Sequence, residues 1–561
     1  MTTTGERRGG RALRLKPSTK AILPASGRRA RRLRAAGLPR PPVECAHVRR
    51  PGLLSPRIAR PPGDSGRRRR DPAHRRPACA QACNRTAPGD RAPPRAARDP
   101  LEAPLKDLTF LTIAEAGRLL RARELTSVEL TNACIARADA VEPALNAFIT
   151  RTPELALAAA RAADVELAAG LDRGPLHGIP VAVKDLCATR GVRTTAGSAI
   201  LADWIPDHDA TVVTKLREAG AVPLGKLNLH EFAYGVTSNN PHYGPVRNPW
   251  NTGCHPGGSS GGSGASVAAG ECFAAIGTDT GGSIRIPAAL CGIVGLMPTY
   301  GLVSRAGVTP LSWSLDHVGP LARTVQDAAL FLNQVAGFDP ADPGSATHSG
   351  FDAMAELGRD IKGIRVGVSR SQAESVEPAV AAAFETALGL LRHLGALVVD
   401  VEIPLLDAGL RVNVLQAEAA AYHARWLREC PEKYGDDVRA LLLWGATLTA
   451  VDYINDLRVR REFTAQVRRA METVDVIATP TCPAVACPID ATADGAYRYG
   501  ALTGPWDHTG QPVISVPCGF GEGGLPIGLS LAGRPFEEAL LCRVAHAYEQ
   551  ATPWHDQHPP I

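Results

Sequence analysis

Residues 256–287 read PGGSSGGSGASVAAGECFAAIGTDTGGSIRIP, and this glycine- and serine-rich stretch restricts most strongly what the chain can form. Glycines bend a chain, cradle a phosphate or expose a nucleophile because their backbone adopts conformations that other residues avoid. A P-loop needs a lysine directly after its glycines, and a dinucleotide-binding turn needs G-x-G-x-x-G with an acidic residue about 20 positions later. Neither pattern is present, so the stretch favours a catalytic loop over a nucleotide site.

The segment GSSGG (258–262) also matches the G-x-S-x-G turn that exposes the nucleophile of α/β-hydrolases, with Ser260 at its centre. His317 or His508 would then be the base. That fold needs a hydrophobic strand leading directly into the turn, whereas NPWNTGCHP precedes it here. This arrangement therefore remains the weaker alternative.

Ser283, at the end of the run TDTGGS, is the better candidate nucleophile. The residues before it, Thr280, Gly281 and Gly282, can turn their backbone N–H groups toward one point, which suits a tetrahedral oxyanion. A serine hydroxyl needs a base, and Lys184 ends the apolar run PVAVK. Burial at that position would lower the pKa of the lysine and leave a neutral amine that accepts a proton. The plain alternative is a lysine at a strand end that reaches water.

The order of apolar segments predicts one large α/β domain over residues 105–556. Nearly continuous apolar strands that alternate with helices indicate a mixed β-sheet covered by helices on both faces. Helical spacing covers 111–170, with Thr126 or Ser127 as a helix N-cap. Strands are predicted at 179–185, 221–226, 364–370 and 397–404, a helix at 376–395, and paired strands at 513–520 and 526–534 before a closing helix.

Several segments resemble the amidase signature family. GIPVAVKD around Lys184, PGGSSGGS around Ser259 and GTDTGGSIRIPAALCGIVG around Ser283 are similar to that family's signature, with intervals of 75 and 24 residues. Further similar segments follow in the family's order, at 194–198, 209–233, 243–251, 303–332 and 524–555. The resemblance therefore covers most of the chain after residue 104.

The resemblance implies the amidase signature fold and a Ser–cis-Ser–Lys triad. Ser283 would attack an amide carbonyl and form an acyl-enzyme. Ser259, preceded by a cis peptide bond, would pass a proton between Ser283 and Lys184, and later to the departing amine. The implied activity is hydrolysis of the C–N bond of a carboxylic amide to an acid and ammonia or an amine.

Other positions are expected to support the loops rather than react. Asp279 and Arg285 flank the nucleophile and should hold its loop by hydrogen bonds, while Ser260 and Ser263 should support the preceding turn. Met297 stands where the family usually has lysine. Because this position lies outside the triad, the departure concerns a local ion pair and not the chemistry.

Two segments are candidates for the substrate pocket. The segment PWDHTGQPVISVP (505–517) differs from the Asn- and Leu-containing versions of the family, and YGVTSNN (234–240) is either a pocket loop or a structural turn. The segment 416–446 lacks the Asn-Leu-Ala-Arg-Tyr-Asp-Gly type stretch of the A subunit of the glutamine-dependent tRNA amidotransferase. It therefore favours a stand-alone amidase over that subunit, which would need partner proteins and tRNA.

Further alternatives are an allophanate- or biuret-type hydrolase and a binding or scaffold protein that retains the amidase fold. The second is disfavoured because all three triad positions are filled. A small-molecule amide is the expected partner, with no nucleic acid except tRNA under the amidotransferase alternative. The oligomeric state is left open, a homodimer included.

The first 100 residues differ from the rest in charge and composition. They hold 26 Lys and Arg against 6 Asp and Glu and no aromatic residue, whereas the remaining 461 residues hold 36 basic and 50 acidic ones. Such a segment buries too little apolar surface to fold, so residues 1–104 are predicted to be a disordered Arg/Pro-rich extension. An extension without function is favoured over a nucleic-acid-binding arm or a transit peptide, and a start assigned too early is one origin of such an extension.

No apolar run reaches the roughly 18–20 residues that span a bilayer, and no secretory segment follows Met1. The cysteine pairs Cys79–Cys83 and Cys482–Cys487 lack histidine partners at zinc-site spacing. We therefore expect no membrane span, no metal and no cofactor, and free thiols in a reducing cytoplasm.

Overall fold

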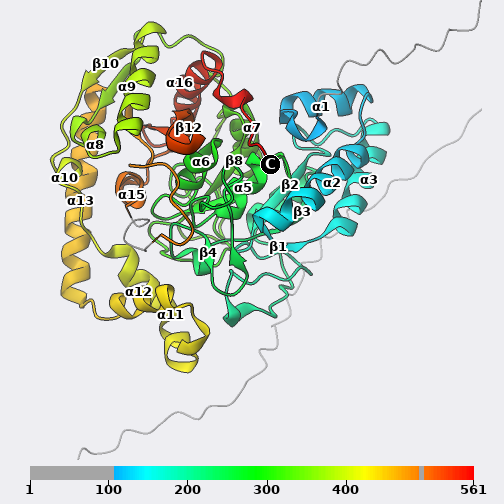
Figure 1. Ribbon diagram of the computed structural model, residues 1–561, viewed down its shortest axis with the longest axis horizontal. Helices are drawn as coiled ribbons and strands as arrows, with labels where there is room; N and C mark the ends of the chain where they lie inside the picture. Colours follow the sequence, from blue (N-terminus) through cyan, green and yellow to red (C-terminus); the bar gives the residue numbers. More distant parts are fainter. Residues whose placement is uncertain (1–106, 492–497) are drawn as a thin grey trace, which may run out of the picture. The chain divides into compact units, whose positions relative to one another are not determined.

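The computed structural model describes residues 107–491 and 498–561 (Figure 1). The predicted extension over 1–104 and the start of the domain at residue 105 lie outside the described residues. Within the described ranges, no helix is both long enough and apolar enough to cross a bilayer.

One mixed sheet forms the centre of the described part and contains eleven strands there. The pairs β2–β3, β2–β6, β9–β10 and β9–β11 are parallel, and the other neighbours are antiparallel. In spatial order the strands are β1 (Phe148–Arg151), β3 (Val222–Leu227), β2 (Pro180–Lys184), β6 (Ala274–Asp279), β8 (His317–Ala322), β7 (Val294–Met297), β12 (Val513–Phe520), β13 (Pro526–Ala532), β11 (Val476–Pro480), β9 (Arg365–Val368) and β10 (Leu397–Asp400). A short separate ribbon pairs β4 (Asn239–Asn240) with β5 (Gly244–Pro245).

Helices cover both faces of this sheet, which confirms the predicted fold class (Figure 1). Helix α5 packs on α6 and on β6, and α6 packs on β7. Helix α7 packs on α16 and on β8, and α16 packs on β12. The described helices are α1 (Ile113–Ala122), α2 (Ser127–Leu145), α3 (Pro153–Ala168), α4 (Thr211–Glu218), α5 (Gly261–Ala268), α6 (Arg285–Cys291), α7 (Val325–Val335), α8 (Arg370–Glu374), α9 (Pro378–His393), α10 (Pro404–Asp407), α11 (Val414–Glu429), α12 (Asp436–Gly445), α13 (Ala450–Thr473), α15 (Gly500–Thr509) and α16 (Glu538–Gln550).

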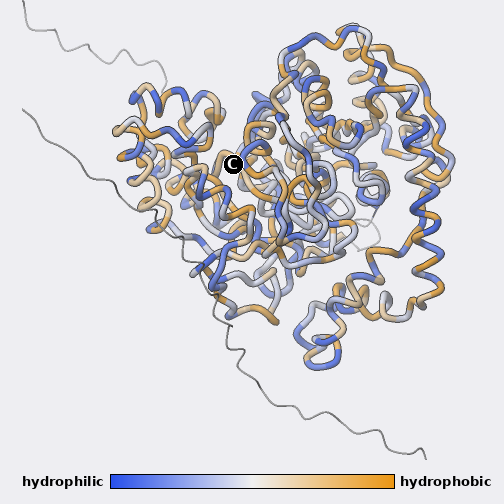
Figure 2. Tube along the Cα trace, turned by 180° about the vertical axis from the view of Figure 1, so that it is seen from behind, coloured by the Kyte–Doolittle hydropathy of each residue, from blue (hydrophilic) through white to orange (hydrophobic). Residues whose placement is uncertain are grey.

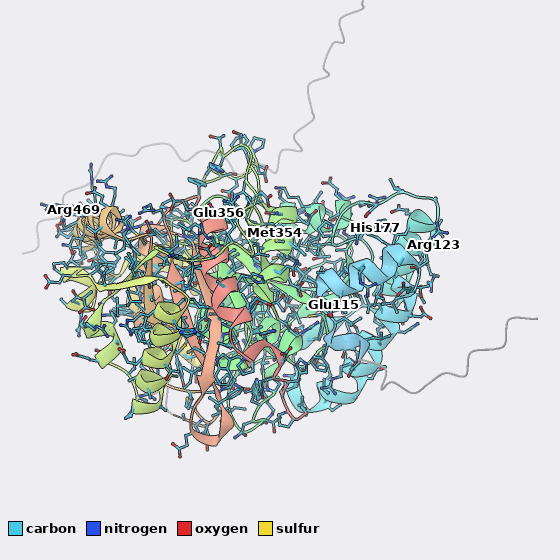
Figure 3. All side chains as sticks on the ribbon, turned by 90° about the horizontal axis from the view of Figure 1, so that it is seen from above. Glu115, Arg123, His177, Met354, Glu356 and Arg469 are labelled. Carbon is cyan, nitrogen blue, oxygen red and sulfur yellow. The ribbon has the colours of Figure 1, made fainter. Side chains whose placement is uncertain are left out.

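The long helix α13 illustrates how the peripheral helices attach. It buries Phe463, Val467 and Met471, which recur every four residues and so lie on one face. Figure 2 shows hydrophobic and hydrophilic residues interspersed along it, as expected for a helix that buries one face. Figure 3 shows that Arg469 of this helix and Arg123, next to α1, lie at opposite ends of the described part.

Most predicted elements are confirmed, and one is wrong. Thr126 is the N-cap of α2 and forms a capping box with Glu129. The region 111–170 is not helical throughout, because Phe148–Arg151 forms edge strand β1 and pairs antiparallel with β3. The flanking segments have helical spacing, so the sequence pattern did not indicate this short strand. Its conformation depends on pairing with β3, whose residues lie 74 or more positions away.

The sheet order brings two strand ends together. β2 ends at Lys184 and β6 ends at Asp279, and the two strands are parallel neighbours with Val183 opposite Ile276. The carboxyl ends of parallel neighbours lie at the same edge of a sheet. The lysine therefore lies beside the loop that follows β6.

Candidate active site

Lys184 is fully buried at the end of β2 and points into a group of hydroxyls. Its Nζ lies 2.8 Å from the side-chain oxygens of Ser259, Ser260 and Thr278. The two serines come from the turn that leads into α5, which packs on β2 and β6. The three hydroxyls that surround this amine thus belong to residues 75 to 94 positions after Lys184 in the chain.

The protonation of this amine follows from its surroundings. Burial lowers the pKa of Lys184 to about 7, although the negative charges of Asp279 and Asp316 oppose the shift. A neutral amine has two N–H donors and one lone pair. The hydroxyl of Ser260 donates to the Thr278 carbonyl at 3.2 Å, so its oxygen accepts from Lys184. With three oxygens around two N–H groups, the hydroxyl of Ser259 or of Thr278 donates to the lone pair.

The turn at residues 257–262 is held in one conformation by close backbone packing. The peptide bond between Gly258 and Ser259 is cis. The Ser259 carbonyl accepts from the His230 amide at 3.1 Å and from the Ser238 hydroxyl at 3.2 Å. A Cβ added at Gly262 would lie 2.4 Å from the carbonyl oxygens of two neighbouring segments, so only glycine fits there.

Ser283 lies in the loop between β6 and α6, with 6% of its surface exposed. Its carbonyl accepts from the Ser260 amide at 3.3 Å, which connects the Ser283 loop to the preceding turn. Gly282 has a φ of +127°, and a Cβ there would lie 2.2 Å from Oγ1 of Thr503. The Thr503 hydroxyl donates to the Gly281 carbonyl at 2.7 Å. The Gly282 amide donates to Asp279 at 2.5 Å, so Thr280 and Gly281 are the better placed of the expected oxyanion donors.

Asp279 and Arg285 form a buried ion pair behind this loop. The carboxylate of Asp279 accepts from the backbone amides of Gly282 and Ile284 and from the Arg285 guanidinium at 2.9 Å. Arg285 also donates to Asp507 at 2.7 Å, and all three charged side chains are fully buried. Burial alone would raise the pKa of Asp279, but the Arg285 charge holds it well below its usual range. Burial and the neighbouring Asp279 charge raise the pKa of Asp507, whereas the Arg285 charge opposes this shift.

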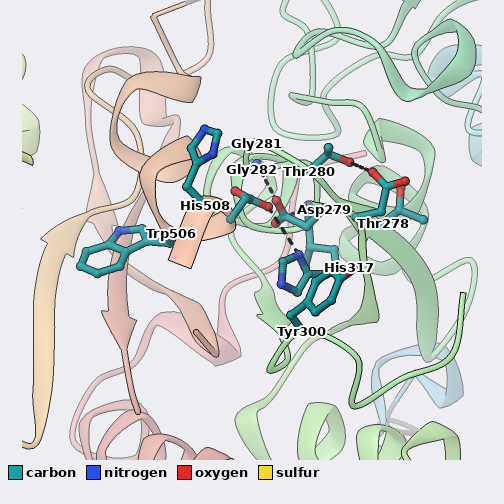
Figure 4. Close-up of polar contacts among 12 residues, drawn as sticks. Thr278, Asp279, Thr280, Gly281, Gly282, Tyr300, His317, Trp506 and His508 are labelled. Carbon is teal, nitrogen blue, oxygen red and sulfur yellow. Dashed lines mark hydrogen bonds and ion pairs between the residues drawn. The ribbon is translucent and has the colours of Figure 1, made fainter. Parts of the chain in front are cut away.

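Two cavities lie beside the loop that contains Ser283. One, of about 380 Å³, is lined by Ser283, Gly281 and Thr280. The other, of about 520 Å³, is lined by Thr278, Thr280 and Asp316, and Ser283 does not line it. Figure 4 shows Gly281 and Gly282 with His508 on one side and Thr280 and Thr278 on the other. Of these two cavities, only the smaller one is lined by Ser283.

A family model described as Amidase matches residues 129–542. The chain belongs to the amidase family. This assignment confirms the resemblance drawn from the sequence, and it makes the protein an enzyme that acts on amide C–N bonds.

Individual relatives of this amidase carry more specific names. The A subunit of the glutamyl-tRNA(Gln) amidotransferase of Chloroflexus aggregans is 44% identical over 486 residues, which are 82% of this chain and 99% of that protein. One solved chain comes from a vestigial protein complex that is described as revealing the evolutionary origins of an s-triazine catabolic enzyme. It is 36% identical with a TM-score of 0.75, and the match covers 79% of this chain and 98% of that chain. The peptide amidase of Stenotrophomonas maltophilia is 34% identical with a TM-score of 0.71, and the match covers 80% of this chain and 98% of that chain.

The amidase fold brings Lys184, Ser259 and the Ser283 loop together. The elbow alternative fails, because Ser260 is fully buried and its hydroxyl is bonded to Lys184 and to a backbone carbonyl. The Ser263 hydroxyl donates to the Ile276 carbonyl at 3.0 Å, so it contacts backbone rather than the lysine. Met297 is fully buried in an apolar cluster that includes Trp506.

Sequence reasoning missed three residues of this site. Thr278 contacts Lys184, Thr503 holds Gly281, and Asp507 completes the Arg285 network. Thr278 could have been found from its position two residues before the TGGS run on an apolar strand. The other two lie more than 200 residues from their partners. Asp507 belongs to the segment 505–517 that the sequence offered as a pocket candidate, but nothing local indicates its contact with Arg285. No group of His, Cys, Asp and Glu side chains in the described ranges is arranged to hold a metal ion.

Replacing Asp279 by asparagine should destabilise this amidase strongly. The substitution removes one of the two carboxylates that contact the fully buried Arg285, and removing one member of a buried pair costs about 3–5 kcal/mol. Urea unfolding measures this loss. Glu462→Gln is the control, because Glu462 and its partner Arg469 are 56% and 61% exposed and such pairs contribute roughly 0–1 kcal/mol. Equal losses in the two variants would contradict the prediction.

Proposed function

We propose that this chain hydrolyses carboxylic amides through an acyl-enzyme on Ser283. The Oγ of Ser283 attacks the carbonyl carbon, and its proton passes to Ser259 while the Ser259 proton passes to Lys184. The oxygen that becomes negative is received by backbone N–H groups at Thr280 and Gly281. The C–N bond then breaks as the proton returns through Ser259 to the leaving nitrogen, and water hydrolyses the ester by the same route.

The observation that supports this proposal is the contact of Lys184 Nζ with Ser259 Oγ at 2.8 Å in a fully buried setting. A general base works best when its pKa lies near the operating pH. Burial lowers the pKa of Lys184 to about 7, so the neutral base is well populated at physiological pH.

A second candidate is the A subunit of a glutamyl-tRNA(Gln) amidotransferase, which would release ammonia from glutamine inside a complex. Curated relatives with this name are 44–45% identical over nearly their whole length. They favour this candidate over the stand-alone enzyme that segment 416–446 predicts. The two candidates share the same triad and differ in acyl substrate and in their need for partners.

Ammonia release from simple amides by the purified full chain separates the candidates. Activity without added protein, lost in Ser283→Ala, is the result expected for the hydrolase. Release that needs glutamine, partner proteins and charged tRNA would instead establish the amidotransferase role. Full activity in Ser283→Ala would contradict the acyl-enzyme itself.

A further inference from the structure

The cavity beside Ser283 has a wall made largely of apolar side chains. Its volume of about 380 Å³ lies in the range of small-molecule sites. The apolar members come from the segment before α11, from α11 and from α12: Leu410, Val412, Leu415, Leu441 and Trp444. Trp444 is 46% exposed and therefore forms part of the rim as well as the wall.

The polar members of the wall are neutral. Among the described residues that line this cavity, none is Asp, Glu, Lys or Arg. Arg411 lies in sequence between two lining residues but is exposed and is not part of the lining. Burial lowers the pKa of His508 to about 3, so its ring is uncharged at neutral pH.

Two neutral groups in the wall retain hydrogen-bonding capacity. The Oε1 of Gln416 and the Nδ1 of His508 are buried atoms without a hydrogen-bond partner among the described residues. These two atoms can form hydrogen bonds with an uncharged polar group of a ligand. They cannot balance a full charge, which in a partly enclosed apolar site needs an ionised partner.

From this lining we infer that the cavity selects amides whose acyl part is uncharged and apolar, and that it disfavours a free amino acid such as glutamine. This inference rests on the proposed acyl-enzyme chemistry at Ser283. Glutamine carries an ammonium and a carboxylate on the acyl side of its amide, and both would lose hydration against Leu415, Leu441 and Trp444. The inference thus separates the two candidate functions on structural grounds.

A series of three substrates tests the inference on the purified full chain. Pentanamide, glutaramate and L-glutamine share a chain of the same length next to the carboxamide, and they add first a carboxylate and then an ammonium. We expect kcat/KM for pentanamide to exceed that for either charged amide by about tenfold or more, because the charges would lose hydration without gaining an ionised partner. Ammonia release is measured for each, with Ser283→Ala as the background.

The outcomes separate the inference from the proposed function. Glutaramate or glutamine turned over as well as pentanamide, with full dependence on Ser283, would overturn the inference and leave the acyl-enzyme standing. No Ser283-dependent release from any of the three would overturn the proposed stand-alone function.

Two neighbouring residues of α12 provide a matched pair of variants. Trp444 lines the cavity, whereas Leu443 is 52% exposed and does not line it. Trp444→Ala should lower kcat/KM for pentanamide by about tenfold through lost apolar contact, and Leu443→Ala should change it by less than about twofold. Equal effects of the two substitutions would contradict the placement of the acyl group against this wall.

Discussion

Replacing Lys184 by methionine is expected to lower kcat/KM by about 10⁴-fold, because the variant lacks the base that accepts the Ser283 proton. Methionine keeps the length and apolar body of the side chain, so the buried site is still filled. The control is Lys215→Met, a half-buried lysine whose amine donates to the Val335 and Ala336 carbonyls at the end of α7. It should keep activity within about threefold. A Lys184→Met enzyme with normal turnover would exclude this lysine as the base.

The same lysine predicts how activity depends on pH. The reaction needs the neutral amine, and burial lowers the pKa of Lys184 to about 7. The kcat/KM of the wild type should therefore rise as pH increases through about 7 and level off above it. A profile that falls over this range would contradict a neutral lysine base.

The pKa of Lys184 also makes a prediction about stability, with a definite sign. The unfolded chain holds this proton up to a pH near 10.5, whereas the folded chain releases it near 7. The stability that this lysine contributes is therefore present above pH 10.5 and is lost as pH falls toward 7. Relative to Lys184→Met, the wild type should gain up to about 5 kcal/mol between pH 7 and pH 10.5. Urea unfolding of both proteins across this range measures the difference, in which other groups cancel.

Replacing Ser283 by alanine should lower kcat/KM by about 10⁴- to 10⁶-fold, as loss of a covalent nucleophile does in other serine enzymes. It should also prevent labelling by a fluorophosphonate, which forms a stable bond with an activated serine. Ser263→Ala is the matched control, because this serine belongs to the same glycine-rich stretch and its hydroxyl donates to the Ile276 backbone carbonyl. It should keep labelling and activity within about threefold. A label found by peptide mass spectrometry on Ser260 would restore the hydrolase-elbow alternative.

Local sequence determined much of the fold and the nucleophile loop. The run PVAVK predicts a buried strand that ends at Lys184, and the structure forms β2 over Pro180–Lys184. Thr126 predicts the start of α2 because its side chain accepts from the Glu129 amide. Gly282 is required by its own φ of +127°. These features depend on backbone geometry and on a few neighbouring residues, so the sequence carries them directly.

The short edge strand β1 shows where such reasoning stops. Its four residues lie between helices, and only pairing with β3 makes them a strand. The sequence motifs give the number of residues between Lys184 and the serines at 259 and 260. The 2.8 Å contacts between their side chains depend on β2 and β6 lying side by side.

By itself, the sequence determined which groups we propose to react and their order along the chain, because these groups are carried by short motifs whose conformation is local. Only the tertiary structure decided their charge and their surroundings. The shifted pKa of Lys184 comes from burial by several elements, and the Arg285–Asp507 contact joins residues 222 positions apart. The uncharged wall of the cavity is likewise assembled from separate helices. Burial and long-range pairing are properties of the packed chain, since each depends on residues that become neighbours only on folding.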